Sequence, residues 1–218
     1  MKSTPSRRLR DSGLIYPCTC SRKDLERALS APHEALHAAD GISESLPEND
    51  DELPYPGTCR EKIGTAKDYD SPAGVSWRFK VHDGETISFN DGYFGHQEFV
   101  AGRDFADFLL WRRDDIPAYQ LAVVVDDAAM QITEVVRGAD LLKSTARQLL
   151  LIRTLGYPTP AYFHCPLLLD EKNVRLAKRH DALSLRKLRE QGVRAEELRK
   201  SFAATHPRTV MAAIERDK

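Results

Sequence analysis

The sequence lacks the long apolar runs of membrane and secreted proteins. No stretch approaches the roughly 20 apolar residues that a membrane-spanning helix needs. The basic segment 1–11 is not followed by the apolar core of a secretory signal peptide. We therefore expect a cytoplasmic protein with no membrane span.

Cysteine is also scarce, and the net charge is nearly zero. In a cytoplasmic chain the four cysteines should stay reduced, as metal ligands or buried thiols. The net charge of −1 hides an uneven distribution, because residues 40–52 include six acids and no base, whereas ten lysines and arginines fall in residues 172–200. Such a basic region can face the phosphates of ATP or a nucleic acid, or it can form solvated helix surfaces.

The apolar pattern predicts an α/β fold. Ile132–Val136 and Tyr162–Leu169 are compact apolar runs typical of buried strands. Between them a helical repeat ends at Gly156, a typical C-cap residue. This repeat consists of Leu142, Ala146, Leu149 and Ile152. Strand, helix and strand in this order predict a parallel sheet.

The preceding segments are predicted to be mainly β-structure. Alternation over Val75–Val81 predicts a half-buried strand, and Asp83-Gly84 predicts a hairpin turn into a second strand at Thr86–Phe89. The run Leu121–Val125 fits a buried strand or a helix equally well.

The two ends of the chain differ from this middle region. Ser21 and Asp24 have the spacing of a capping box, which predicts a short helix to about Leu29. Residues 30–54 are acidic and interrupted by prolines, so we expect a loop there. From Ser184 onward, three helical segments are expected, the last one after Pro207.

Three cysteines form the strongest chemical signal. Cys18 and Cys20 are one residue apart, so their thiolates can bind one ion, and Cys59 can close the site from a distant loop. The alternative is three unrelated buried thiols. Tetrahedral zinc needs a fourth ligand, and ordinary ligand preferences favour a histidine. The candidates are His33, His37 and Tyr55. Cys165 lies in a predicted strand and is expected in the core.

The segment His33-Glu34-Ala35-Leu36-His37 matches a metalloprotease motif. That motif needs a long helix and a third metal ligand. Here Pro32 precedes it, an acidic loop follows, and Asp40 and Ser43 stand where a longer form of the motif has glycine and histidine. We therefore expect a chance match or auxiliary zinc ligands.

A basic loop, Arg175-Leu176-Ala177-Lys178-Arg179, follows the predicted strand 162–169. A lysine on a flexible loop can approach ATP phosphates and offset the charge that develops as pyrophosphate leaves. A short basic loop is equally typical of a solvated surface.

Tyr119 and Arg137 are candidates for binding a carboxylate. A guanidinium holds a carboxylate with two parallel hydrogen bonds, and a phenol hydroxyl can complete the orientation. From the residues alone, however, Tyr119 is expected in the core and Arg137 in an ion pair. The candidate partners of Arg137 are Asp126, Asp127 and Glu134.

Together these motifs resemble class I aminoacyl-tRNA synthetases of the glutamyl type, over nearly all of residues 14–183. The resemblance rests on residues 118–127, 132–141 and 174–180. The spacing Cys-x-Cys followed by Tyr-x-x-x-Cys is similar to the zinc site of the glutamyl-queuosine tRNA(Asp) synthetases, and so is the lack of an anticodon-binding domain. Two departures are the 34 residues between Cys20 and Tyr55 and the alanine at position 177 in a Lys-Leu-Ser-Lys-type loop.

The resemblance implies an enzyme that activates glutamate with ATP and Mg²⁺ and transfers the glutamyl group to the queuosine base of tRNA(Asp). Each substrate and the metal then has an implied ligand set. These sets are Arg175 and Lys178 for ATP, with Lys178 catalytic; Tyr119 and Arg137 for glutamate; and Cys18, Cys20, Tyr55 and Cys59 for Zn²⁺.

The resemblance also implies the C-terminal part of an α/β, Rossmann-like catalytic domain. Residues 1–70 would form a zinc-binding insertion with an acidic loop, 71–183 the remaining catalytic domain, and 184–218 a helical segment. The Pro-Ser-Pro-Thr-Gly-like strand and His-x-Gly-type turn that open such domains do not occur. We therefore expect the first half to be missing or supplied by a separate chain. The alternatives are a fragment of a true glutamyl- or glutaminyl-tRNA synthetase and a non-catalytic zinc- and tRNA-binding remnant.

Overall fold

The computed structural model describes residues 5–21, 23–25, 27, 55–61, 74–167 and 185–205. The chain forms two units, Met1–His164 and Cys165–Lys218. Several predicted features lie outside the described residues. They are the loop 30–54 with His33 and His37, the basic loop with Arg175 and Lys178, and the helix after Pro207.

An antiparallel three-stranded sheet holds the N-terminal part of the chain. Helix α1 (Pro5–Ser12) leads into β1 (Ile15–Cys18). Strand β1 pairs with β2 (Ser76–Phe79), which pairs with β5 (Phe108–Trp111). Because β1 ends at Cys18, this sheet fixes the first of the three clustered cysteines.

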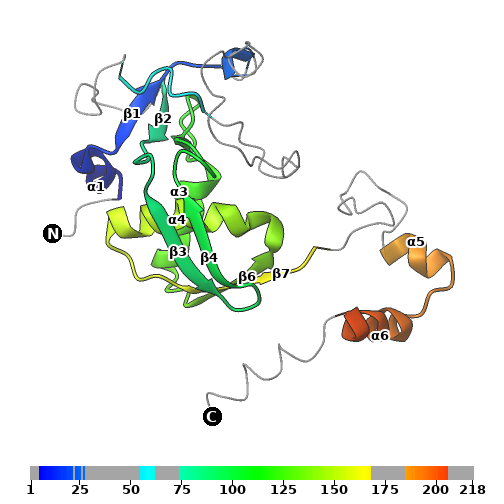
Figure 1. The fold of residues 1–218 in the computed structure, drawn as a ribbon. Helices are drawn as coiled ribbons and strands as arrows, with labels where there is room; N and C mark the ends of the chain where they lie inside the picture. The colour runs from blue at the N-terminus through cyan, green and yellow to red at the C-terminus, as the bar shows by residue number, and fades with distance from the viewer. Residues whose placement is uncertain are drawn as a thin grey trace. The chain divides into compact units, whose positions relative to one another are not determined.

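A second, four-stranded sheet has the order β4-β3-β7-β6. Figure 1 shows its β3–β4 hairpin. Strand β3 (Thr86–Asp91) pairs antiparallel with β4 (Gly95–Val100) and parallel with β7 (Ala161–Cys165). Strand β6 (Glu134–Gly138) lies at the other edge of this described sheet. The end of β3 is therefore positioned by pairing with a distant segment, because Asp91 is the partner of Tyr162.

The predicted hairpin at Asp83-Gly84 is wrong in its pairing. A turn does occur there, with Gly84 at φ +84°, but β2 and β3 belong to different sheets. Strand β2 ends at Phe79. Shortly after it, the backbone N–H of Val81 donates to a side-chain oxygen of Asp107, 2.8 Å away, instead of to a backbone carbonyl of a neighbouring strand. Strand β3 instead forms its hairpin with β4.

The helices follow the local spacing in the sequence. The run Leu121–Val125 is helical, inside α3 (Tyr119–Ala129). The predicted repeat forms α4 (Leu142–Leu155), after a short 3₁₀ turn η2 (Ala139–Leu141), and Gly156 caps it with a φ of +66°. Strands β6 and β7 flank α4 in the chain and are neighbours in the sheet, which confirms the strand–helix–strand prediction.

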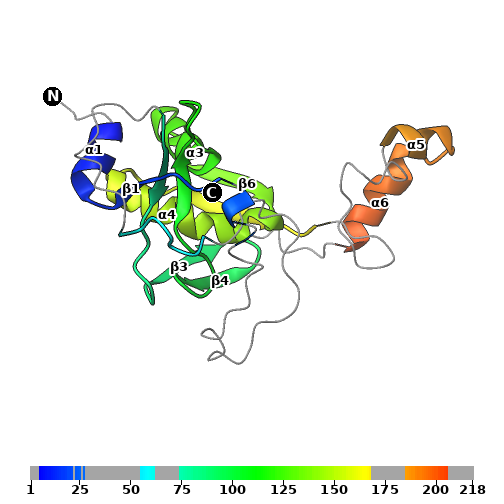
Figure 2. The same ribbon diagram turned by 90° about the horizontal axis from the view of Figure 1, so that it is seen from above.

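The main core lies where α3 and α4 meet the two sheets. Figure 2 shows α4 between α3 and the β3–β4 hairpin, in agreement with the contacts of α4 with both α3 and β3. Phe79 of β2 stacks on Phe108 of β5, with ring centroids 5.2 Å apart. Leu151 of α4 is fully buried in the same cluster. Burial of α4 brings Thr145 to His164 of β7, whereas Ser144 and Gln148 contact Gln120 of α3.

The described part of the second unit is helical, as predicted. It contains α5 (Leu185–Glu190) and α6 (Ala195–Thr205). Near the N-terminus, Ser21 and Asp24 form the predicted capping box, with the Ser21 N–H donating to Asp24 at 2.8 Å. Among the helices that the structure describes, none is both long and apolar enough to span a membrane.

Candidate metal centre and substrate site

Three cysteine sulfurs converge at the end of β1. The Sγ atoms of Cys18, Cys20 and Cys59 all lie within 4.8 Å of one another, and those of Cys20 and Cys59 are 3.5 Å apart. The hydroxyl oxygen of Tyr55 is 3.5 Å from the sulfur of Cys18 and 3.8 Å from that of Cys20. The structure therefore brings together the four side chains that the resemblance implied as zinc ligands.

The geometry of this cluster fits a tetrahedral zinc ion. Ligands about 2.3 Å from zinc stand roughly 3.8 Å from one another at the corners of a tetrahedron. The sulfur–sulfur and sulfur–oxygen distances of 3.5 to 3.8 Å match this spacing. The backbone N–H of Cys59 also donates to the Tyr55 oxygen at 2.7 Å, a contact that would stabilise a phenolate ligand.

The thiols of the cluster differ in their proton affinity. Burial raises the pKa of Cys20 to about 11, together with its contact to Cys59. Burial also acts to raise the pKa of Cys59, but hydrogen bonds, led by the Tyr55 hydroxyl, lower it to about 7. Of these two thiols, Cys59 therefore loses its proton more easily, and the thiolate is the form that binds metal.

A buried carboxylate ties the Cys59 loop to the sheet. Asp107 accepts the hydroxyl of Tyr16 at 2.6 Å, and its Oδ2 lies 3.0 Å from Nε of Arg60, the residue after Cys59. Arg60 also pairs with Asp83 at 2.8 Å on the surface. Because Asp107 is buried and Arg60 half-buried, the ion pair is shielded from water and holds the loop firmly.

Arg137 of β6 is held by neutral partners. Its Nε donates to Nε2 of His164 at 3.0 Å, and its Nη2 donates to Oγ1 of Thr145 at 2.7 Å and to the carbonyl of Leu141 at 3.4 Å. Its guanidinium carbon lies 5.5 Å from the ring centroid of Tyr162. Among the described residues, Nη1 has no partner, so that nitrogen is available to a ligand oxygen.

The imidazole of His164, which accepts from Arg137, also contacts the buried carboxylate of Asp91. Nδ1 of His164 lies 2.6 Å from Oδ2 of Asp91, and both side chains are fully buried. Burial lowers the pKa of His164, although Asp91 acts to raise it. Burial acts to raise the pKa of Asp91, but backbone N–H donors and His164 keep it below its usual value. Asp91 is therefore ionised and His164 neutral near pH 7.

Tyr119 is the first residue of α3 and is 53% exposed. Burial raises the pKa of Tyr162 to about 12, and this residue feels the charges of both Arg137 and Tyr119. Arg137 thus lies beside the Tyr162 ring, and Tyr119 is close enough to act on the pKa of Tyr162. The expectation that Tyr119 lies in the core is wrong, because Tyr119 begins α3 at the surface.

The simpler expectation for Arg137 is also wrong. Its hydrogen-bond partners are His164, Thr145 and the Leu141 carbonyl, rather than the nearby acids. Asp127 is close enough for Arg137 to act on its pKa, which burial nevertheless raises. Cys165, expected in the core, is exposed at the last position of β7.

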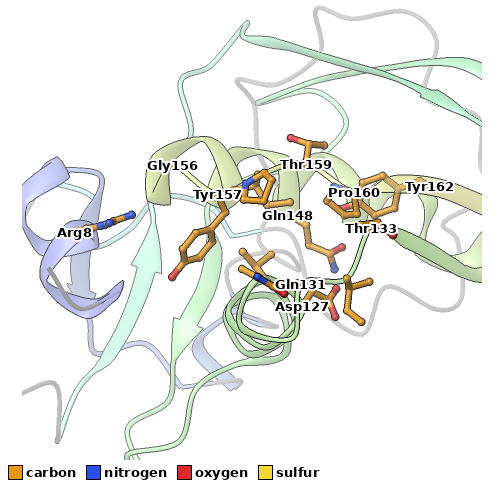
Figure 3. A pocket seen from close by; sticks show the side chains of 15 residues that line it. Arg8, Asp127, Gln131, Thr133, Gln148, Gly156, Tyr157, Thr159, Pro160 and Tyr162 are labelled. Carbon is orange, nitrogen blue, oxygen red and sulfur yellow. The ribbon is translucent and has the colours of Figure 1, made fainter. Parts of the chain in front are cut away.

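A cavity of about 590 Å³ lies between the C-terminal ends of α3 and α4 (Figure 3). Figure 3 shows Gln148 of α4 directed toward Asp127 of α3, with Gln131 of the turn after α3 beside Asp127. Neither Tyr119 nor Arg137 is among its lining residues. Its lining contains one base, Arg8, and one acid, Asp127, so the cavity has no excess of positive charge for a carboxylate.

Sequence reasoning missed the supporting residues of both sites. Asp91 and His164 are 73 residues apart; Asp91 follows the predicted strand Thr86–Phe89, and His164 lies in a segment where apolarity predicts only a strand. Asp107 and Arg60 carry no motif. The only available signal was a polar side chain inside an apolar strand, as at His164, because such a group requires a partner when buried.

The described residues form a mixed α/β domain with three clustered cysteines that could hold a metal ion and an arginine, Arg137, near the end of strand β6. A sequence model of the catalytic domain of class I tRNA synthetases (E and Q) matches residues 7–205, and the chain belongs to this family.

Several curated relatives are similar over most of the chain. The glutamyl-Q tRNA(Asp) synthetase of Nitratidesulfovibrio vulgaris is 46% identical over 188 residues, which cover 84% of this chain and 52% of the relative. That of Symbiobacterium thermophilum is 45% identical over 212 residues, which cover 95% of this chain and 56% of the relative. The chain thus spans about half the length of the curated relatives it matches.

Solved structures support the fold. A glutamate tRNA ligase from Elizabethkingia meningosepticum, solved in complex with its amino acid, is similar with a TM-score of 0.60 and 21% identity, over 83% of this chain and 35% of that one. The glutamate–tRNA synthetase from Elizabethkingia anophelis is similar to the same degree, over 36% of its length. The fold is therefore that of part of a class I synthetase catalytic domain.

Proposed function

We propose that this chain is the part of a glutamyl-Q tRNA(Asp) synthetase that binds glutamate and carries a structural zinc ion. The whole enzyme would activate glutamate with ATP and transfer it to the queuosine base of tRNA(Asp). The observation that carries this proposal is the environment of Arg137, whose Nε and Nη2 are held by neutral acceptors. Among the hydrogen-bond partners of Arg137 in the described residues there is no carboxylate, so a ligand carboxylate could take that place.

The arrangement suits a carboxylate for an electrostatic reason. A guanidinium already paired with an acid would gain little from a second one, whereas Arg137 keeps its full charge for the ligand. Tyr119, exposed near Tyr162, can add a hydroxyl from the start of α3. Arg137 and Tyr119 are thus proposed to bind glutamate.

Zinc is proposed to bind Cys18, Cys20, Cys59 and Tyr55. A closed set of four protein ligands is typical of a structural rather than a catalytic ion. Its contribution here would be to hold the loop around Cys59 against the end of β1.

ATP, with Mg²⁺, is proposed to bind the basic loop that contains Arg175 and Lys178, and Lys178 would offset charge on the phosphates.

The names of the relatives support tRNA(Asp) as the acceptor, and a tRNA substrate agrees with the cytoplasmic location predicted from the sequence. A separate chain that supplies further parts of the active site is part of this proposal.

The first test is amino-acid binding to the chain. Calorimetric or NMR titration should give binding of L-glutamate at millimolar or lower concentration and weaker binding of L-glutamine, because only glutamate presents a side-chain carboxylate. Arg137→Lys keeps the charge but loses the planar fork, and it should weaken binding of glutamate much more than binding of glutamine. Equal binding of both amino acids would contradict the assignment.

The second test concerns the acceptor. The whole enzyme that contains this chain should transfer glutamate to queuosine-bearing tRNA(Asp) and leave tRNA(Glu) uncharged. Charging of tRNA(Glu) would identify a true glutamyl-tRNA synthetase instead. Zinc and tRNA binding without glutamate-dependent pyrophosphate exchange would identify a non-catalytic remnant.

A further inference from the structure

Asp91 and His164 form a contact that the proposed reaction does not yet use. Asp91 ends β3 and His164 lies in β7, and the parallel pairing of Asp91 with Tyr162 brings the two strands together. Gly92 makes this approach possible, because a Cβ atom there would lie 2.6 Å from Cδ2 of Phe163. The backbone N–H of Gly92 donates to the carbonyl of Tyr162 at 2.8 Å, which locks the register.

The protons of His164 can be assigned from its partners. The carboxylate of Asp91 only accepts, so Nδ1, 2.6 Å from it, must carry hydrogen. Arginine only donates, so Nε2, 3.0 Å from Nε of Arg137, must be the acceptor. Only the neutral imidazole with hydrogen on Nδ1 satisfies both contacts.

Asp91 is itself held in place. Its Oδ1 accepts the backbone N–H groups of Tyr93 and Phe94, each at 3.0 Å. Its Oδ2 also lies 3.1 Å from the backbone nitrogen of His164. The carboxylate is therefore fixed by the turn after β3, and it transmits that position to the imidazole.

We propose that Asp91 and His164 are positioning residues that orient Arg137 toward the carboxylate of glutamate. Asp91 selects the tautomer of His164, His164 accepts Nε–H of Arg137, and Thr145 accepts Nη2–H, so that Nη1 is presented to the ligand. This inference rests on the proposed function, because it takes glutamate as the ligand of Arg137.

The arrangement also predicts a pH dependence of binding. A proton on Nε2 would turn the acceptor of Arg137 into a second donor, so Arg137 would lose its fixed orientation. The groups that face His164 are Asp91 of β3, Arg137 of β6, Asp140 of η2, Thr145 of α4 and the ring of Tyr162 beside it on β7. Asp91 and Asp140 favour this proton, whereas Arg137 and burial oppose it.

The test begins with the ligand-free chain. Long-range proton–nitrogen NMR should show His164 as the neutral Nδ1–H tautomer between about pH 6 and 8, assigned by the loss of its signals in His164→Gln. In Asp91→Asn, an amide N–H facing Nδ1 should shift the hydrogen to Nε2. An Nε2–H tautomer or an imidazolium in the wild type would overturn the inference, whatever the chain binds.

Titration with L-glutamate then tests the role. His164→Leu should weaken binding about tenfold or more, since it removes an acceptor from a charged donor. His164→Gln can place an amide oxygen where Nε2 stands in the wild type, so it should bind glutamate nearly as tightly as the wild type. In the wild type, glutamate affinity should fall at low pH as Nε2 takes up a proton, and in His164→Gln this fall should be absent. The exposed His96 provides a matched control, and His96→Leu should bind as the wild type does.

Glutamate binding distinguishes the positioning role of His164 from the proposed function of the chain. Glutamate binding by His164→Leu as tight as that of the wild type overturns the positioning role and leaves the proposed function intact. If the wild-type chain binds no glutamate although His164 has the expected tautomer, the proposed function fails, and Asp91 and His164 have a structural role only.

Discussion

The hydroxyl oxygen of Tyr55 lies 2.7 Å from the backbone nitrogen of Cys59 and within 3.8 Å of the sulfurs of Cys18 and Cys20. The same oxygen is thus placed where a fourth metal ligand would stand. A phenol that is buried and surrounded by thiols gains from a cation, because metal binding removes the proton that burial otherwise retains.

The purified chain should contain about one zinc ion per molecule. Metal analysis should show strong loss of zinc in Cys20→Ser and weakened affinity in Tyr55→Phe. Cys165→Ser is the matched control, because Cys165 is exposed and outside the cluster. Unchanged zinc content in Cys20→Ser would rule out the site. Full zinc affinity in Tyr55→Phe would shift the fourth ligand to His33 or His37.

Asp107→Asn should destabilise the fold by about 3 kcal/mol, because the half-buried Arg60 loses its buried counter-ion and an NH₂ donor replaces one of the two oxygens that accept from Tyr16 and Val81. Urea denaturation measures the free energy of unfolding. Asp83→Asn removes the exposed partner of the same arginine and should cost at most about 1 kcal/mol. Equal effects of the two variants would contradict the role of the buried pair.

The free energy of unfolding should fall as the pH drops below about 6.5, with His164 as one cause. The folded chain keeps His164 neutral with a lowered pKa, whereas the unfolded chain takes up a proton near the ordinary value, so acid favours unfolding. Asp91 also has a lowered pKa, so its contribution is lost only below about pH 4. Urea titrations of the wild type and His164→Gln should show a shallower pH slope in the variant. Identical slopes between pH 4 and 6.5 would refute this assignment.

In the whole enzyme, Lys178→Ala and Arg137→Ala should have different kinetic effects. Loss of Lys178 should slow adenylate formation by about 10²–10³, since the lysine acts on charge that develops in the transition state. Loss of Arg137 should first raise the KM for glutamate, because it removes a partner of the bound substrate. The measurement is glutamate-dependent exchange of labelled pyrophosphate into ATP. The same defect in both variants would contradict this division of roles.

Residues 1–218 alone should give no such exchange above background. The sequence contains no glycine-containing turn of the expected type to hold the triphosphate, and orientation of two substrates can account for roughly 7–11 kcal/mol of a barrier. The assay at high enzyme concentration decides. Robust exchange would show that these residues hold a complete active site.

Local spacing in the sequence was enough to predict several elements. The repeat of α4 and its glycine cap, the flanking strands, the capping box of Ser21 and the two helices of the second unit all depend on neighbours within a few residues. The cysteine spacing likewise predicted that Cys18, Cys20 and Cys59 come together, since two of them are nearly adjacent, and whether they bind a metal stays a prediction. The fourth, Tyr55, was implied by the resemblance.

Tertiary structure decided what long-range contacts control. Local signals could not tell that β3 pairs with β4 and β7 rather than β2, or that Arg137 contacts His164 instead of the acids near it in sequence. A short apolar run such as Leu121–Val125 fits either a buried strand or a helix. Packing against α4 and β5 selects the helix. Buried polar groups choose partners by position in the folded sheet, because each must be satisfied where it lies. Local sequence therefore determined the elements with a clear period and the convergence of the cysteines, while the fold determined the strand pairing and the side chains that contact Arg137.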